Sequence, residues 1–229
     1  MILKQKTTIF NKLGYEFVKL NKGFDGEDVK GFKNYWNNMP DDKYIRSNFK
    51  YRRRRYSKFE YDSVLNEMTN LGATYFQTKE HNHIYGGHGR DFDPVRSEFL
   101  DDPLFRYFLD EDCRFFREHH IVKERKCPMG VHLMRTTSDV SNDGIVTPEG
   151  IHKDGHYAFA IHMIDRNNVA GGATNLYDNS KVIMVSRTLD KFGETLFVED
   201  DKLYHDVSPI SNVDKRYPGT RDVLIIEFY

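Results

Sequence analysis

The sequence predicts a mainly β fold with added helices, in which a sandwich or jelly roll follows a helical and mixed N-terminal segment. Two observations support this class. From about Val131 onward, short apolar or alternating runs are separated mostly by clusters of Gly, Asn, Asp or Pro. The amphipathic spacing of helices occurs only before that point. Many short strands without intervening helices are typical of a sandwich or jelly roll.

The first part of the chain contains two helix candidates. Thr7 to Leu20 carries apolar side chains at helical spacing, interrupted by Gly14. The segment Asp101-Asp102-Pro103 is a good helix start, because acidic residues stand near the cap and Pro fits the first turn. The residues that follow suit a stripe facing a core, namely Leu104, Phe105, Phe108, Leu109, Phe115 and Phe116.

Strand candidates fill the second part. We expect a single domain over residues 1–229, because no internal repeat or low-complexity linker divides the chain. Within it, residues from 1 to about 125 form the helical and mixed part, and residues from about 126 to 229 form the jelly-roll half. The strand candidates are Val131–Arg135, Tyr157–Ile164, Thr174–Tyr177, Val182–Val185, Thr195–Val198 and Arg221–Phe228.

Composition and charge restrict the function classes. The 34 Lys and Arg residues nearly balance the 35 Asp and Glu residues, so the net charge of −1 attracts neither nucleic acid nor an anionic membrane. Mean hydropathy is −0.70, and no apolar run approaches the roughly 20 residues of a membrane span. The first residues lack the apolar segment of a secretory signal, and two cysteines make no disulfide framework. We therefore expect a cytoplasmic protein without a nucleic-acid or membrane partner.

Three residues of the second part have the types and spacing of an iron site. His152 and Asp154 are separated by one residue, so on an extended strand their side chains point to the same face. His205 lies on a second strand-like segment. Two imidazoles and one carboxylate form the ligand face of non-haem Fe(II) sites, which leaves open positions for a cosubstrate and O2. A bare His-x-Asp also arises by chance, so the motif depends on its context.

Arg221 opens the most apolar strand candidate, Arg221–Phe228. The simpler interpretation is a charged residue at the entrance of a strand. The functional interpretation is a guanidinium that grips the far end of a dicarboxylate, because its planar fork donates two parallel hydrogen bonds to a carboxylate.

Several separated motifs in the same order make the chain resemble the Fe(II)/2-oxoglutarate-dependent dioxygenases. The resemblance is to the family that contains bacterial L-isoleucine 4-hydroxylase and related free amino-acid hydroxylases, and it covers most of the chain from about residue 50 onward. In the first half it rests on Tyr75–Glu80, Asn82, Gly86–Gly87 and Arg90–Phe92. In the second half it rests on His132–Arg135, Pro148–Asp154, Ile161–Ile164, Asn168–Gly172, Tyr204–Pro209 and Arg221–Leu224.

The resemblance implies a double-stranded β-helix, which is a jelly roll, as the core. His152, Asp154 and His205 match the iron ligands of the family, and Arg221 matches the residue that binds the 2-oxoglutarate carboxylate. Val223 stands where the wider superfamily places a hydroxyl in an Arg-x-Ser pattern, so the second contact to that carboxylate must come from elsewhere. The presence of Asp154 favours hydroxylation over halogenation, because related halogenases lack this carboxylate.

The resemblance also implies Fe(II) as cofactor, with 2-oxoglutarate and O2 as cosubstrates. The predicted reaction is hydroxylation of an unactivated C–H bond in a small molecule, a free L-amino acid, with release of succinate and CO2. Two alternatives remain open at this point. One is a dioxygenase that acts on a macromolecule such as nucleic acid or protein, and the other is a non-catalytic jelly-roll binding module.

A basic run over residues 51–58 has three interpretations. It is a solvated face, or it follows a nucleic-acid backbone with its flanking aromatic residues. By the resemblance, one of its guanidiniums binds the carboxylate of the substrate, with Arg53 and Arg55 as the candidates.

Three polar residues inside strand candidates are further candidates for the pocket wall, namely His132, His162 and Thr174. A lone histidine in a strand is usually a hydrogen-bonded core residue. On a strand, His162 points to the same face as Ala158 and Ala160, and these small neighbours leave space beside the imidazole.

Overall fold

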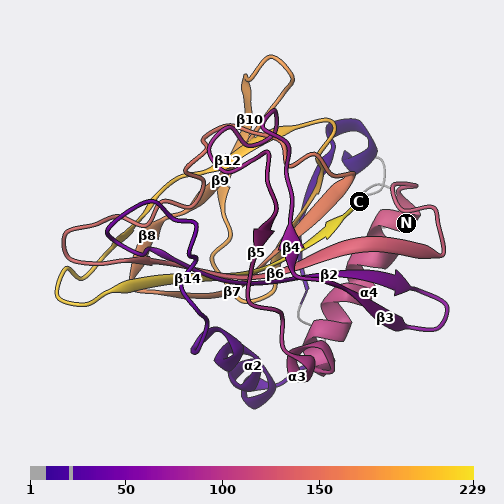
Figure 1. Ribbon diagram of the computed structural model, residues 1–229, viewed down its shortest axis with the longest axis horizontal. Helices are drawn as coiled ribbons and strands as arrows, with labels where there is room; N and C mark the ends of the chain where they lie inside the picture. The colour runs from indigo at the N-terminus through magenta and orange to yellow at the C-terminus, as the bar shows by residue number, and fades with distance from the viewer. Residues whose placement is uncertain (1–8, 21–22) are drawn as a thin grey trace.

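The computed structural model describes residues 9–20 and 23–229 of the chain. A seven-stranded sheet, in which every neighbouring pair is antiparallel, crosses the centre of the molecule (Figure 1). Its strands, in order across the sheet, are β1 (Tyr15–Lys19), β11 (Glu194–Glu199), β7 (Ala158–Asn167), β14 (Gly219–Phe228), β6 (Lys126–Ser138), β2 (Arg52–Asp62) and β3 (Glu67–Gly72).

Three smaller antiparallel sheets complete the β structure. The three-stranded sheet faces one side of the large sheet, and helices α2 (Gly26–Lys33), α3 (Ser97–Leu100) and α4 (Pro103–Glu118) lie on the other side (Figure 1). The smaller sheets are β10 (Ile183–Thr188) with β9 (Ala173–Tyr177) and β12 (Tyr204–Val207), β13 (Ile210–Asn212) with β8 (Val169–Gly171), and β4 (Thr74–Tyr75) with β5 (Arg90–Asp91). Two facing antiparallel sheets confirm the predicted mainly β, jelly-roll class.

The longest described helix, α4 (Pro103–Glu118), begins where the sequence predicts. The carboxylate of Asp102 accepts a hydrogen bond of 2.8 Å from the backbone N–H of Leu104, and Pro103 occupies the first turn. Phe115 is half-buried, whereas the other predicted stripe residues are buried. Further helical segments are α2 (Gly26–Lys33), the 3-10 turn η1 (Asn34–Trp36), α3 (Ser97–Leu100) and residues 9–13.

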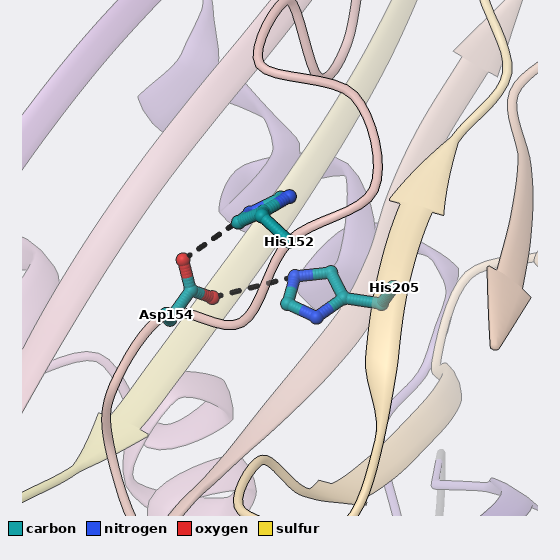
Figure 2. A group of neighbouring side chains, drawn as sticks. All are labelled: His152, Asp154 and His205. Carbon is teal, nitrogen blue, oxygen red and sulfur yellow. Dashed lines mark ion pairs between the residues drawn. The ribbon is translucent and has the colours of Figure 1, made fainter. Parts of the chain in front are cut away.

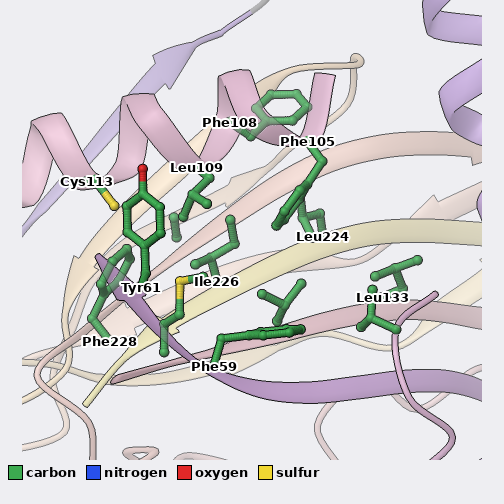
Figure 3. Close-up of a cluster of buried hydrophobic side chains, with 14 of the residues drawn as sticks. Phe59, Tyr61, Phe105, Phe108, Leu109, Cys113, Leu133, Leu224, Ile226 and Phe228 are labelled. Carbon is green, nitrogen blue, oxygen red and sulfur yellow. The ribbon is translucent and has the colours of Figure 1, made fainter. Parts of the chain in front are cut away.

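Strand β14 separates the hydrophobic core from a polar pocket. Successive side chains of a strand point to opposite faces. Leu224, Ile226 and Phe228 face helix α4 and pack with its aromatic residues (Figure 3). The alternate positions, Arg221 to Glu227, line the pocket on the other face. The large sheet thus carries the main core on one face and the candidate site on the other.

The helix predicted for Thr7 to Leu20 is wrong beyond Leu13. Residues 9–13 are helical, and Thr7 lies outside the described residues. Gly14 adopts a positive φ of 77°, a conformation that favours glycine and commonly ends helices. The chain then forms β1, which pairs with β11 at the edge of the large sheet. Pairing with β11 therefore overrides the helical spacing of the apolar residues.

The N-terminal part is more than a cover on the jelly roll, because β1, β2 and β3 join the same sheet as the C-terminal strands. The basic run is part of β2, whose eleven residues pair in continuous register with β6. The single-domain organisation stays a prediction, and this shared sheet favours it.

The six strand candidates of the second half all overlap strands of the structure, with boundaries shifted or extended by one or more residues. In the segments that the structure describes, no helix is long and apolar enough to span a membrane.

Candidate active site

A pocket lies between the inner face of the large sheet and strand β12, and loop residues Gln77, Asn82 and Tyr85 also line it. The strands contribute every second residue, as the alternation of a pleated sheet requires. The strand residues that line the pocket are Arg52 and Arg54 of β2; Tyr75 of β4; Arg90 of β5; His132, Met134 and Thr136 of β6; Phe159 and Ile161 of β7; His205 and Val207 of β12; and Arg221, Val223, Ile225 and Glu227 of β14.

The structure brings His152, Asp154 and His205 together beside this pocket. One ligand atom from each lies within 4.8 Å of the others. The Nε2 atoms of both imidazoles lie 3.4 Å from oxygens of Asp154 and face that carboxylate (Figure 2). The backbones of His152 and His205 form an isolated antiparallel bridge with hydrogen bonds of 3.0 and 2.8 Å. This bridge places the imidazole of the distant segment against the His-x-Asp pair.

Neighbouring groups fix the orientation of the three side chains. Gln77 donates a hydrogen bond of 2.9 Å from its amide to Asp154. Asp200 accepts backbone hydrogen bonds of 3.1, 2.7 and 3.2 Å from residues 154–156, which holds the segment that carries Asp154. The Nδ1 of His152 lies 2.8 Å from the carbonyl of Gly150. Because a carbonyl only accepts, Nδ1 carries a proton, so Nε2 is the nitrogen left to bind a cation.

The donor set fits Fe(II). Two imidazole nitrogens and one carboxylate lie on one side and leave the pocket side open. Burial lowers the pKa of His152, but the adjacent Asp154 carboxylate outweighs this effect and raises the pKa to about 9. A cation between these side chains replaces the proton that now balances the carboxylate, so metal binding releases a proton.

Arg221 is a buried cation in the pocket wall, with 2% of its surface exposed. Within residues 9–20 and 23–229, no carboxylate lies within ion-pair distance of its guanidinium and its Nε has no hydrogen-bond partner. Burial and nearby Arg166 lower its pKa to about 10, so it remains charged at neutral pH. Its neighbour Asp222 bonds to Arg135 instead, at 2.7 and 2.6 Å. An unpaired buried guanidinium is suited to an anionic ligand.

Glu227 is the centre of a buried polar cluster at another part of the wall. Its carboxylate lies 2.8 Å from Nε2 of His132 and 3.4 Å from Nε2 of His156, and it accepts a hydrogen bond of 3.1 Å from Tyr75. Burial lowers the pKa of His132 to about 4, so this imidazole is neutral and its Nδ1 accepts a hydrogen bond of 2.6 Å from Arg54. His132 therefore lines the pocket and fixes Arg54.

The structure corrects the two candidates of the basic run. Strand β2 alternates, so Arg52 and Arg54 point into the pocket, whereas Arg53 and Arg55 point away. Arg53 lies 3.3 Å from Asp41 at the surface, and Arg55 donates to a backbone carbonyl in an exposed contact. Arg53 and Arg55 therefore do not line the pocket, whereas their neighbours Arg52 and Arg54 do.

His162 and Thr174 also lie away from the pocket. His162 is on the helix-facing side of β7, with its ring nitrogens 2.9 Å from Thr195 and 3.0 Å from Asp112 of α4. The small residues Ala158 and Ala160 belong to the main core that α4 covers, so the space beside them is filled by that packing. Thr174 is fully buried on β9, where it pairs with Val207.

Several pocket residues had no role in the sequence predictions. Arg90 and Gln77 lie in segments that carry the family resemblance, but nothing in those segments indicates their contacts. Glu227 could have been predicted as a pocket residue, because side chains an even number of positions apart on one strand point to the same face, and Arg221 and Glu227 are such a pair. Alternation along residues 51–58 groups Arg52 with Arg54 and Arg53 with Arg55, but it does not show which pair faces the pocket.

Arg52 differs from the other pocket arginines because it has a carboxylate partner. Its Nε donates a hydrogen bond of 2.8 Å to Asp42, and both side chains are buried. Burial alone raises the pKa of Asp42, but the charges of Arg52 and Arg54 together with the hydrogen bonds from Tyr44 and Arg52 outweigh it and lower this pKa below its usual value.

This pair predicts a contribution to acid stability. A carboxyl group with a lowered folded-state pKa stabilises the protein above its unfolded pKa of about 4, and this stabilisation is lost as pH falls through the folded pKa. The free energy of unfolding, measured by urea denaturation between pH 3 and 6, should fall less steeply with acid in Asp42→Asn than in the wild type. Equal slopes would show that Asp42 has no lowered pKa.

The chain is similar to two bacterial enzymes. It is 29% identical over 194 residues to L-isoleucine-4-hydroxylase of Bacillus thuringiensis, a match that spans 83% of this chain and 78% of the relative. It is 26% identical over 156 residues to 3(1)-hydroxy-L-isoleucine 4-dioxygenase of Pantoea ananatis, spanning 67% of this chain and 63% of the relative.

Solved structures share the fold. The crystal structure of IDO from Bacillus thuringiensis superposes with a TM-score of 0.81 at 21% identity, covering 99% of this chain and 95% of that chain. A bsmA homolog from Methylobium petroleophilum superposes with a TM-score of 0.85 at 22% identity, covering 98% and 92%. A family model described as 2OG-Fe dioxygenase matches residues 33–227, which is most of the chain and includes all three ligand candidates and Arg221. The chain therefore belongs to the 2OG-Fe dioxygenase family.

Proposed function

We propose that this enzyme hydroxylates an unactivated C–H bond of a free L-amino acid and converts 2-oxoglutarate and O2 into succinate and CO2. The observation that carries the proposal is the convergence of His152, Asp154 and His205 in one pocket that also contains the unpaired guanidinium of Arg221. The names of the two similar enzymes, which refer to L-isoleucine and a hydroxylated L-isoleucine, support an amino-acid substrate.

His152, Asp154 and His205 would hold Fe(II), which when bound supplies the activation of O2 and the oxidation of the C–H bond. The protein's own contribution is geometric. Gln77 and Asp200 hold the segment and the carboxylate of Asp154, and the His152–His205 backbone bridge fixes the separation of the imidazoles.

Arg221 would bind the far carboxylate of 2-oxoglutarate through its planar fork. We propose Thr136 as the second contact, in place of the hydroxyl that Val223 lacks. Thr136 stands directly opposite Arg221 in the β6–β14 register, is buried, and lines the same pocket. Gly172 makes room for Arg221, because a Cβ at this position would lie 3.1 Å from the Arg221 Cδ.

Apolar side chains complete the pocket and would exclude water from the reacting carbon. Phe159, Ile161 and Val207 line it, and the ring centre of Phe159 lies 4.8 Å from that of the ligand candidate His205. A wall of this kind favours an aliphatic side chain as the group that is oxidised. Discrimination by one methylene is worth only about 1–3 kcal/mol, so we expect several related aliphatic amino acids to be accepted.

A small molecule is favoured over nucleic acid because two of the four arginines of the basic run point into the pocket. Arg52 and Arg54 are buried in the pocket wall and are therefore not available to a phosphate backbone. Salt-sensitive binding of a single-stranded oligonucleotide would support the macromolecular alternative instead. A third possibility, a non-catalytic binding module, would be supported if the protein failed to bind Fe(II). We also propose a cytoplasmic location.

Incubation of the protein with Fe(II), 2-oxoglutarate, O2 and a panel of free L-amino acids tests the proposal. We expect succinate release above the background without amino acid, together with a mass gain of one oxygen in one or more aliphatic members. Reactions without 2-oxoglutarate are the control. Succinate release that no free amino acid stimulates would contradict the proposed substrate class.

A further inference from the structure

Two buried arginines in the pocket have no role in holding iron or 2-oxoglutarate. Arg54 and Arg90 are 6% and 2% exposed, and both line the pocket. Over the described part of the chain, neither has a carboxylate within ion-pair distance, whereas neighbouring Arg52 is paired with Asp42. Their Nε atoms are buried without a hydrogen-bond partner in the same residues.

The two guanidiniums share one aromatic wall. The Cζ of Arg54 lies 4.8 Å from the ring centre of Tyr75 and 4.3 Å from that of Phe92. The Cζ of Arg90 lies 5.1 Å and 6.0 Å from the same two rings. Cation–π contacts of this kind hold a guanidinium in place and leave its edge available for hydrogen bonds.

Each guanidinium is also anchored by one neutral acceptor. Arg54 donates to Nδ1 of His132 at 2.6 Å, and Arg90 donates to the side-chain carbonyl of Gln77 at 2.8 Å. The same Gln77 donates to the metal-ligand candidate Asp154 at 2.9 Å. Arg90 is therefore two hydrogen bonds away from Asp154, and an anion bound by it lies beside the metal centre.

Two buried like charges side by side are costly unless an anion compensates them. Burial and the nearby charge of Arg54 lower the pKa of Arg90, which reports the same unfavourable environment. A ligand with one planar carboxylate relieves both costs, because two guanidinium edges supply parallel donors to its two oxygens.

We propose that Arg54 and Arg90 together bind the α-carboxylate of the amino-acid substrate. This inference rests on the proposed function and adds the residues that select a free acid. It requires a second anion site, distinct from that of Arg221. Arg54 and Val223 both pair with Met134 of β6, so their backbones lie at the same level of the sheet. Strand β6 lies between β2 and β14, so the backbone of Arg54 is two strand spacings, about 10 Å, from the strand that carries Arg221. Two separate anion sites suit carboxylates of two different molecules, the distal carboxylate of 2-oxoglutarate and the α-carboxylate of the zwitterionic substrate.

The first test needs no variant. Binding to the Fe(II)–2-oxoglutarate enzyme is measured by calorimetry for three probes: L-isoleucine, its primary amide L-isoleucinamide, and 2-methylbutylamine, which lacks the carboxylate. We expect affinity for the two probes without a carboxylate to fall at least about tenfold below that for L-isoleucine. Equal affinity for acid and amide would overturn the proposal.

The second test uses Arg54→Lys and Arg90→Lys, with Arg53→Lys on the outward side of β2 as the matched control. Each pocket variant should raise the KM for the amino-acid substrate about tenfold or more and reduce the preference for acid over amide. The KM for the cosubstrate should stay within about twofold, which reports that the site remains folded. A higher KM for the cosubstrate with an unchanged KM for the amino acid would assign these arginines to 2-oxoglutarate and overturn the inference.

The two proposals fail differently. If the wild-type enzyme binds L-isoleucine through its carboxylate but oxidises no amino acid of the panel, the carboxylate site stands and the proposed reaction is wrong. If the enzyme oxidises an amino acid and its amide equally well, the reaction stands and the carboxylate site is wrong.

Discussion

The Asp154→Ala variant is expected to lose amino-acid hydroxylation by roughly 10³-fold or more, because an ordered metal site supplies several kcal/mol of transition-state stabilisation. Asp154 lies between two imidazoles whose Nε2 atoms are each 3.4 Å from its oxygens. Removing this carboxylate removes one of the three ligand candidates and the charge that would complement the cation. Turnover is followed by succinate release and product mass, and Fe(II) affinity is measured on the same preparation.

Asp143→Ala is the matched control, because Asp143 is exposed and lies outside the pocket. It should retain wild-type turnover and Fe(II) affinity. Both variants must also be compared for thermal unfolding, since a general loss of fold would lower both quantities. Undiminished hydroxylation by Asp154→Ala, with iron still bound, would rule out the assignment of Asp154 as a ligand.

The local periodicity of the sequence was sufficient to predict the half of the fold that carries the ligand candidates. Turn residues divide that half into strands, and the predicted strands survive in the structure because each of them pairs on at least one side. Where the local spacing of apolar residues and the structure disagree, pairing with a segment distant in sequence determines the secondary structure. Residues 15–19 have helical spacing, yet pairing with β11 makes them a strand.

The candidate site shows the same division. The His-x-Asp pair is local, so its shared face follows from the spacing of two residues. Which face of a strand meets the pocket depends on contacts with residues distant in sequence. For this reason Arg53, Arg55 and His162 were wrongly predicted to line the pocket. His162 faces α4 because the aromatic stripe of that helix covers the alanine side of β7. Arg53 faces solvent because the register of β2 with β6 turns Arg52 and Arg54 inward.

The contacts of Gln77 and Arg90 have no sequence signal at all, since they depend on how a loop folds across the pocket. Gln77 joins Arg90 to Asp154 through its two amide ends, which requires all three segments to be in place. The sequence shows which residue types are present in that loop, whereas only the tertiary structure shows that they meet.

The second large effect is expected at Arg221, where Arg221→Lys should raise the KM for the cosubstrate 2-oxoglutarate by roughly 10- to 150-fold. A hydrogen bond to a charged group contributes about 1.5–3 kcal/mol, and lysine keeps the charge but loses the planar fork. Thr136→Val, which removes one neutral hydroxyl, should raise the same KM only about 2- to 10-fold. Initial rates of succinate formation at varied 2-oxoglutarate concentrations give both values.

Arg135→Lys is the matched control for Arg221→Lys, because Arg135 is on the neighbouring strand and bonds to Asp222 on the far side of the sheet from the pocket. Loss of its fork should lower stability and leave the KM for the cosubstrate unchanged. The two anion sites make the Arg221 result decisive in either direction. If Arg221→Lys instead raised the KM for the amino acid and spared that for the cosubstrate, 2-oxoglutarate would have to bind at Arg54 and Arg90, and both assignments would be exchanged.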